Sequence, residues 1–145
     1  MLKLTRFIGK SDVKDVTLVN PADAEKLDVG HWITPNAEGK YIISASATIG
    51  ADAATKLARM VYSENGRTDV RSIRKISTIR GGGIEGLTDQ YIGNSFTLGA
   101  DLTLGIDSDD LVKFAAATAG DVVKAVVIAP LPSAGNPVLA FELVD

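Results

Sequence analysis

Short apolar stretches separated by turn residues run through most of this chain, and few of them have the spacing of a long helix. The clearest case is the C-terminal part, where two apolar segments, 122–129 and 138–144, flank a loop rich in Pro, Ser, Gly and Asn. "HWITPNAEGKYIIS" repeats this arrangement over a shorter distance, with a loop at 35–39. Each pattern predicts two strands joined by a turn. We therefore expect a mainly β fold.

Helical structure is predicted only as short turns. In "NPADAEKLDVGHW", Asn20 can cap a helical turn that begins at Pro21. Asp52 can cap another turn through Lys56, but residues 57–62 also alternate as in a strand, so a helical turn and a strand both remain open there.

The stretch that follows Phe96 mixes strand and turn signals. "FTLGADLTLG" predicts two short strands around a turn at Gly99. "DSDDLVKF" comes next and predicts a helical turn, with Asp107 or Ser108 as its cap.

"IRGGGIEG" contains a formal G-x-G-x-x-G at Gly81, Gly83 and Gly86. A dinucleotide site needs a strand before these glycines and a helix directly after them. Here "LTDQYIGNSF" follows, which favours β structure and lacks helical spacing. Before them, isoleucines recur every three residues at 73, 76 and 79, which fits neither a helix nor a strand well. We expect a strand with a bulge, bent by the glycines.

The first 16 residues mix charged residues with four large apolar ones, Leu2, Leu4, Phe7 and Ile8, without a clean period. Such a segment is typical of an arm that packs on another molecule, or of a frayed first strand. We predict an N-terminal arm over 1–16, loosely placed in the isolated protein, and one β-rich domain over 17–145. The four apolar residues are then candidates for contact with a partner.

Composition excludes several classes of function. The 145 residues are 46% hydrophobic and include no cysteine, which excludes disulfides, thiol catalysis and thiolate metal sites. No apolar run approaches the roughly 20 residues that a membrane span needs, and the N-terminal residues lack a signal-peptide pattern. We expect a soluble protein that is made and used inside a cell.

Charge is distributed unevenly along the chain. Residues 56–80 hold seven basic and two acidic residues, whereas residues 81–145 hold two basic and nine acidic residues. This asymmetry indicates charge complementarity to a partner or between copies, although two solvated faces would give the same pattern. The candidate contact residues for an oligomer or partner are Arg59, Arg67, Arg71, Arg74 and Arg80. Nucleic acid binding by residues 56–80 is the alternative, disfavoured because the whole chain is acidic and Tyr62 is the stretch's one aromatic.

Candidate catalytic and metal sites are weak. His31 is the one histidine in the sequence and lacks a nucleophile motif, so we interpret it as a partly exposed strand residue. "DSDD" at 107–110 lacks the glycine and the closing Glu of a calcium loop, which indicates a solvated turn. We expect no enzyme activity, no cofactor, no metal and no small-molecule substrate.

The order of these segments resembles the decoration, or cement, proteins of tailed-bacteriophage capsids. The resemblance covers most of the chain from about Gly30, and its closest pieces are "GRTDV", "TDQYIGNSFTLGADLTL" and "AGDVVKAVV". It implies a small β-barrel or β-tulip-like domain, often trimeric, that binds the major capsid protein on the outside of the shell and stabilises the head. It also implies that the N-terminal arm pairs with a neighbouring capsid loop, that the protein is made in the host cytoplasm, and that it is located in the virion.

Overall fold

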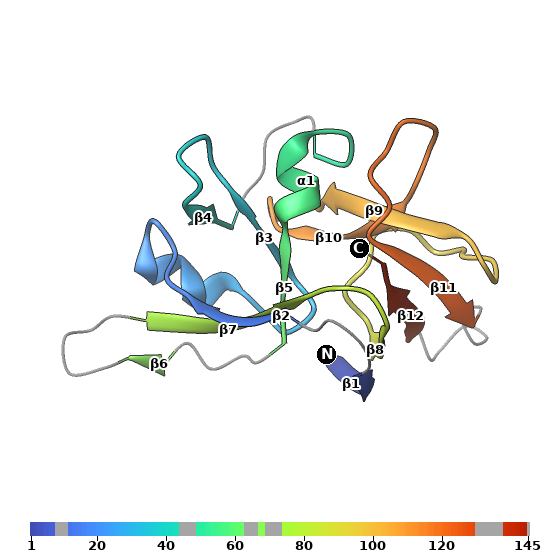
Figure 1. Cartoon of the computed structure of the whole chain (residues 1–145), viewed down its shortest axis with the longest axis horizontal. Coiled ribbons are helices and arrows are strands. Elements are labelled where there is room, and N and C mark those ends of the chain that lie inside the picture. Colours follow the sequence, from blue (N-terminus) through green and yellow to red (C-terminus); the bar gives the residue numbers. More distant parts are fainter. Residues whose placement is uncertain (8–11, 44–48, 63–66, 69–73, 130–137, 145) are drawn as a thin grey trace.

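The computed structural model describes residues 1–7, 12–43, 49–62, 67–68, 74–129 and 138–144, with backbone positions alone at 6, 7, 67, 68, 74 and 75. Twelve strands and two short helices make up this part of the chain (Figure 1). In chain order these are β1 (Leu2–Phe7), β2 (Asp12–Val16), the 3-10 helix η1 (Pro21–Lys26), β3 (Trp32–Pro35), β4 (Tyr41–Ile42), α1 (Ala53–Leu57), β5 (Arg59–Val61), β6 (Arg67–Thr68), β7 (Arg74–Arg80), β8 (Ile84–Thr88), β9 (Asp101–Ile106), β10 (Val112–Ala116), β11 (Ala125–Ala129) and β12 (Leu139–Leu143).

All the strand pairs are antiparallel, and the strand order is β1-β8-β12-β11-β9-β10-β3-β5-β7-β2, with β4 added to β3 and β6 added to β7. The prediction of a mainly β domain is therefore confirmed. The barrel that the resemblance implied is not formed, because the strand order ends at β1 on one side and at β2 on the other.

β1 and β2 follow one another in the chain and run antiparallel to β8 and β7, which also follow one another. Phe7 lies opposite Ile84 at the end of the first ladder, and Asp12 lies opposite Arg80 at the start of the second. The chain passes from β7 to β8 through residues 81–83, which we call the corner, while residues 8–11 lie outside the described residues.

The glycines of "IRGGGIEG" form this corner. Gly81 and Gly83 have φ values of 120° and 82°, which other residues rarely adopt. Strand β8 follows directly, where a dinucleotide site would need a helix. The expectation that these glycines bend a strand is confirmed.

A large apolar core lies on the inner face of the sheet. Its fully buried aromatic residues are Trp32, Phe114 and Phe141, and the Phe114 ring contacts the other two, with centroids 5.5 Å from Trp32 and 5.0 Å from Phe141. Burial of this much apolar surface is the main stabilising contribution to the fold.

A second core lies on the other face of β3, β5, β7 and β2, beneath η1. Alternating residues supply the two cores, since Trp32 and Met60 belong to the first and Ile33 and Val61 to the second. We call these four strands the double-core half of the sheet, and β1, β8, β12, β11, β9 and β10 the single-core half.

Burial on both faces explains the three-residue spacing of isoleucines. Ile76 lies in the second core and Ile79 in the first, because an odd separation along a strand places side chains on opposite faces. Both are buried, at 3% and 0% exposed.

Two of the three predicted helical turns form. The Asn20 side chain accepts a hydrogen bond from the Ala22 N–H at the start of η1, and Asp52 Oδ1 accepts one of 3.1 Å from the Thr55 N–H in α1. β5 begins two residues after α1 ends, so this stretch contains both the helical turn and the strand. The helical turn predicted after Asp107 is wrong, because β10 begins at Val112.

The predicted hairpins at the C-terminal end (β11 with β12) and at 32–43 (β3 with β4) both form. Of the two strands predicted around Gly99, the second forms as β9. The first is wrong, since residues 96–100 make no strand and Phe96 instead packs against the main core.

The prediction of a separate arm over 1–16 is also wrong. β1 pairs with β8 and β2 pairs with β7, so this segment belongs to the same sheet as the proposed domain over 17–145. Alternation is hidden in the sequence because the ladder to β8 shifts register between Leu4 and Arg6, and because the partner strand changes from β8 for β1 to β7 for β2.

Candidate interaction surfaces

Two of the four apolar residues expected to contact a partner pack within the domain. Leu2 and Leu4 are half-buried and pack against the main core. The backbone of Phe7 lies opposite Ile84, and Ile8 lies outside the described residues. The apolar side chains of Leu2 and Leu4 thus stabilise this domain.

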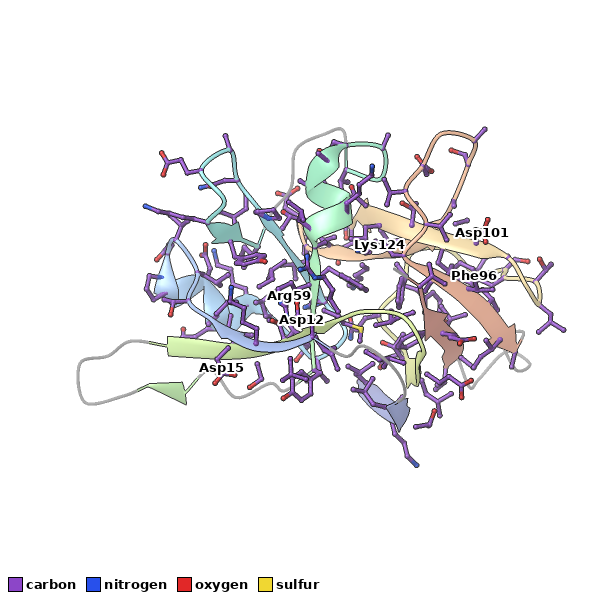
Figure 2. The ribbon with its side chains drawn as sticks, in the orientation of Figure 1. Asp12, Asp15, Arg59, Phe96, Asp101 and Lys124 are labelled. Carbon is purple, nitrogen blue, oxygen red and sulfur yellow. The ribbon has the colours of Figure 1, made fainter. Side chains whose placement is uncertain are left out.

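Arg59 was a candidate for surface contact, and that assignment is wrong. Its side chain is 1% exposed and lies across β7 (Figure 2). Nε donates to Thr78 Oγ1 at 2.7 Å, Nη1 donates to Asp12 Oδ2 at 2.8 Å, and Nη2 donates to the Asp12 carbonyl at 2.6 Å. One guanidinium therefore connects β5, β7 and β2, which sequence spacing alone could not indicate.

Asp12 also receives a second cation, because Arg80 Nη2 lies 3.3 Å from its Oδ2. The hydrogen bond from Arg59 lowers the pKa of the Asp12 carboxyl, and the charges of Arg59 and Arg80 add to this effect against the opposing effect of burial. Asp12 is thus held ionised, and Arg80 is partly neutralised.

Of the other three candidate arginines, Arg71 lies outside the described residues, and the backbones of Arg67 and Arg74 lie in the paired strands β6 and β7. Backbone pairing places Arg67 opposite Lys75 and Thr68 opposite Arg74. Within the described part of segment 56–80, Arg59 is buried and Arg80 pairs with Asp12, so neither contributes a free charge to a basic groove for nucleic acid.

His31 is buried at 3% exposure, so its interpretation as a partly exposed residue is wrong. Its Nδ1 accepts the Asp28 N–H at 2.8 Å, which places the neutral imidazole proton on Nε2. Burial lowers the pKa of His31, and the nearby Lys113 charge lowers it further. The histidine therefore serves as a neutral acceptor that fixes the turn before β3.

Lys124 is a buried lysine that the sequence interpretation missed. It is 4% exposed, its Nζ donates to the Lys56 carbonyl at 3.1 Å, and it lies 5.4 Å from the centre of the Trp32 ring. Both contacts hold Nζ of Lys124 at this end of the core. An open cavity of about 550 Å³ lies beside it.

In the "DSDD" turn, the carboxylate oxygens of Asp107 are bonded by groups of the same chain. Asp107 Oδ1 accepts the Asp109 and Leu111 N–H groups at 2.8 and 3.0 Å, and Oδ2 contacts Lys113 Nζ at 2.8 Å. Burial raises the pKa of Asp107, but these donors outweigh burial and lower it. Within the described ranges, no group of three or more His, Cys, Asp or Glu side chains is placed to hold a metal ion.

β2 lies at one end of the strand order, and among the described strands it pairs with β7 alone, so its other edge is free of a described partner strand. Val13 is 50% exposed there, and Val19, shortly after the strand, is 54% exposed. Beside this edge lies a groove of about 510 Å³ between residues 14–19 and residues 39–41. Unpaired strand edges of this kind accept an additional strand from a partner.

Comparison of the chain with protein-family models, curated proteins and solved structures found no match. In the described part of the chain, no helix has the length and apolar character needed to cross a membrane.

Proposed function

We propose that this chain is a structural protein of a tailed-bacteriophage head. It binds the exterior of the capsid through the major capsid protein, stabilises the shell by bracing neighbouring capsid subunits, and acts as a homotrimer without catalysis. The sequence resemblance motivates this proposal, and the exposed edge of β2 supplies a surface for it.

The observation that carries the proposal is the direction of the β2 backbone. The Lys14 carbonyl accepts a hydrogen bond from Thr78 Oγ1 of β7, so the backbone groups of Lys14 face β7. Backbone groups point to alternate sides along a strand. Those of Val13 and Asp15 therefore face the free edge, where an extended segment of a capsid subunit can pair with them.

This differs from the expectation for the N-terminal residues. The sequence predicted that these residues leave their own domain and add to a partner's sheet. In the proposed mode they stay in the domain, and β2 accepts a strand from the capsid protein. Main-chain hydrogen bonds supply affinity in either case, and many equivalent sites on one shell increase it through multivalency.

A proline at position 13 tests this mode. Val13→Pro removes an N–H that faces the free edge and keeps the ladder to β7, whereas Val13→Thr keeps the N–H and changes only the side chain. We expect cosedimentation with capsid shells to fall at least about tenfold for the proline variant and to stay near wild type for the threonine variant.

Circular dichroism checks that both variants fold. Equal shell binding by both variants would exclude the β2 edge as the attachment surface. Absence of the wild-type protein from the shell in electron micrographs of mixed samples would refute the function itself.

A further inference from the structure

The groove beside the free edge of β2 limits the chemistry of a strand that can bind there. It has a volume of about 510 Å³ and lies between residues 14–19 and residues 39–41. Lys14 and Val16 both line it, and Val16 belongs to the second core. Because side chains two residues apart in a strand share a face, Lys14 lies on the same face of β2 as Val16. A strand added to this edge therefore directs every second side chain toward the groove.

Two lysines give this groove its charge. Lys14 is exposed, and among the described residues no ion pair reaches it. Lys40, on the other wall, has its Nζ 3.6 Å from Glu38 Oε2. Both members of that pair are largely exposed, so their interaction is weak. A carboxylate placed in the groove would meet both ammonium groups.

The two carboxylates of β2 do not cancel this charge. Asp12 lies on the same face as Lys14 but is already paired with Arg59 and Arg80. Asp15 alternates with Lys14, so its side chain lies on the opposite face of the strand, where its Oδ1 accepts a hydrogen bond from Ser77 Oγ at 3.0 Å. The groove side of β2 is therefore positively charged.

Backbone direction places Lys14 where contact with an added strand is closest. The backbone groups of Val13 and Asp15 face the free edge, so they are the groups that bond an added antiparallel strand. Lys14 lies between them, at a position that makes no hydrogen bond to the added strand. Directly opposite side chains approach most closely at such positions, and opposite charges there attract.

Apolar surface flanks Lys14 on both faces of β2. Val13 is 50% exposed on the face opposite to the groove, and Val19 is 54% exposed where it lines the groove. Tyr41, also in the groove, is half-buried against the second core. An apolar residue opposite Val13 covers the first surface, and one opposite Val16 covers the second. Both contacts remove apolar surface from water.

We propose that β2 binds an acidic extended segment, with Glu or Asp opposite Lys14 and apolar residues opposite Val13 and Val16. Read from its N-terminal end, an antiparallel segment then has the order apolar, polar, acidic, apolar. This inference rests on the proposed function, because it specifies the capsid segment that pairs with β2. Its test uses a peptide and requires no capsid.

Peptide binding measures the preference for an acidic residue. The probe is a synthetic peptide in which Val-Thr-Glu-Val is flanked by threonines, titrated into the isotopically labelled full chain. We expect saturable shifts of the Val13 and Asp15 amide signals in NMR spectra, because their N–H groups gain acceptors. Replacing the glutamate of the peptide by lysine should raise the dissociation constant at least about fivefold.

Charge reversal on the protein completes the comparison. Lys14→Glu should reverse the order of affinity, because the lysine peptide then lies opposite a carboxylate. Lys3→Glu is the matched control, since Lys3 is exposed on β1 at the other end of the strand order, and it should bind both peptides as wild type does. Circular dichroism identifies a variant that fails to fold. Lys14→Gln, which should bind the two peptides about equally, then replaces the reversal.

Three results would overturn the proposal. The first is no shift of the Val13 and Asp15 signals with either peptide up to its solubility limit. The second is equal binding of both peptides by the wild-type protein, or an order of affinity that Lys14→Glu leaves unchanged. The third is a thymidine oligonucleotide that shifts the same signals and displaces the glutamate peptide, which would make the groove a phosphate site.

Cosedimentation with shells, measured separately, tests the capsid function. Shell binding by the wild-type protein together with any of these three results keeps the capsid function and removes the acidic segment. Peptides that follow the predicted order, together with no shell binding, keep the acidic partner and remove the capsid function.

Discussion

The two halves of the sheet use the same strand alternation in different surroundings. In the double-core half, both faces are covered, so Trp32 and Ile33 are both buried although they are neighbours in one strand. In the single-core half, Phe141 is buried while Glu142 lies on the outer face. A buried polar side chain in the double-core half needs hydrogen-bond partners inside the protein, as Arg59 has. A polar side chain on the outer face of the single-core half remains accessible to solvent.

This difference separates stability from binding. Arg59, Thr78 and Asp12 form an internal network that holds the edge strand β2 to the sheet. Among the described residues, no ion pair reaches Asp101 or Glu142 on the single-core half. Substitutions in the Arg59 network should therefore lower the stability of the fold more than substitutions of these two carboxylates do.

Deletion of residues 2–7 is expected to have the largest effect. It removes β1, the packing of Leu2 and Leu4, and the ladder to β8. Apolar burial and hydrogen bonding of this extent correspond to about 3 kcal/mol of unfolding free energy or more. Urea denaturation measures the loss, with Val13→Ala on exposed β2 as a nearly neutral control. A nearly unchanged melting temperature would restore the interpretation of this segment as an arm.

Arg59→Ala should cost almost as much. The substitution leaves Thr78 and a partly exposed Asp12 without their main donor, which we expect to lower the unfolding free energy by about 3 kcal/mol. Arg80→Ala removes the more exposed cation from the same carboxylate and should cost about 0.5 kcal/mol. Chemical denaturation measures both losses of unfolding free energy. Equal losses for the two variants would mean that the burial of Arg59 contributes nothing to stability.

Gly83→Ala should have a smaller effect at the corner between the halves. Gly83 has a φ of 82°, so a side chain there costs about 1 kcal/mol. Gly82 has no positive φ and provides the matched control, with a smaller expected loss from Gly82→Ala. If both variants lose stability equally in thermal denaturation, a steric clash of the added methyl group, rather than the φ angle, determines the requirement for glycine.

The smallest expected effect is a pH dependence that arises from His31. Its folded pKa lies below the unfolded value of about 6.5, so the unfolded chain binds the proton more readily. The contribution of neutral His31 to the free energy of unfolding is therefore present above a pH of about 6.5 and is lost as the pH falls below that value. His31→Asn keeps an acceptor for the Asp28 N–H and should flatten denaturation midpoints between pH 7.5 and 5.5. An unchanged slope would assign the effect to another group.

Sequence reasoning succeeded where local pattern and local structure coincide. The caps at Asn20 and Asp52, the β3–β4 and β11–β12 hairpins and the bend at Gly81 and Gly83 each depend on residues close in the chain. It failed for β10, where the acidic turn before Val112 resembled a helix start although a strand follows.

The candidate site was predicted less well than the fold. The sequence identified residues 1–16 and the arginines of 56–80, but not which of them face solvent. Arg59 was grouped with Arg67 and Arg74 because all three are basic, although Arg59 is buried and the other two lie on a hairpin. The nearness of Glu85, Glu142 and Asp101 was also missed, since these residues become neighbours only through strand register.

By itself, the sequence determined the mainly β class, the short capped helices, the glycine corner and the charge difference between residues 56–80 and 81–145. Each of these depends on residue type and on spacing over a few positions. Only the tertiary structure decided that residues 2–7 and 12–16 join the sheet, that Arg59 is internal, and that Glu85 lies opposite Glu142 on the neighbouring strand. Those outcomes depend on pairing between residues far apart in the chain, such as Leu2 with Thr88 on neighbouring strands. Local sequence carries no information on strand register at that distance.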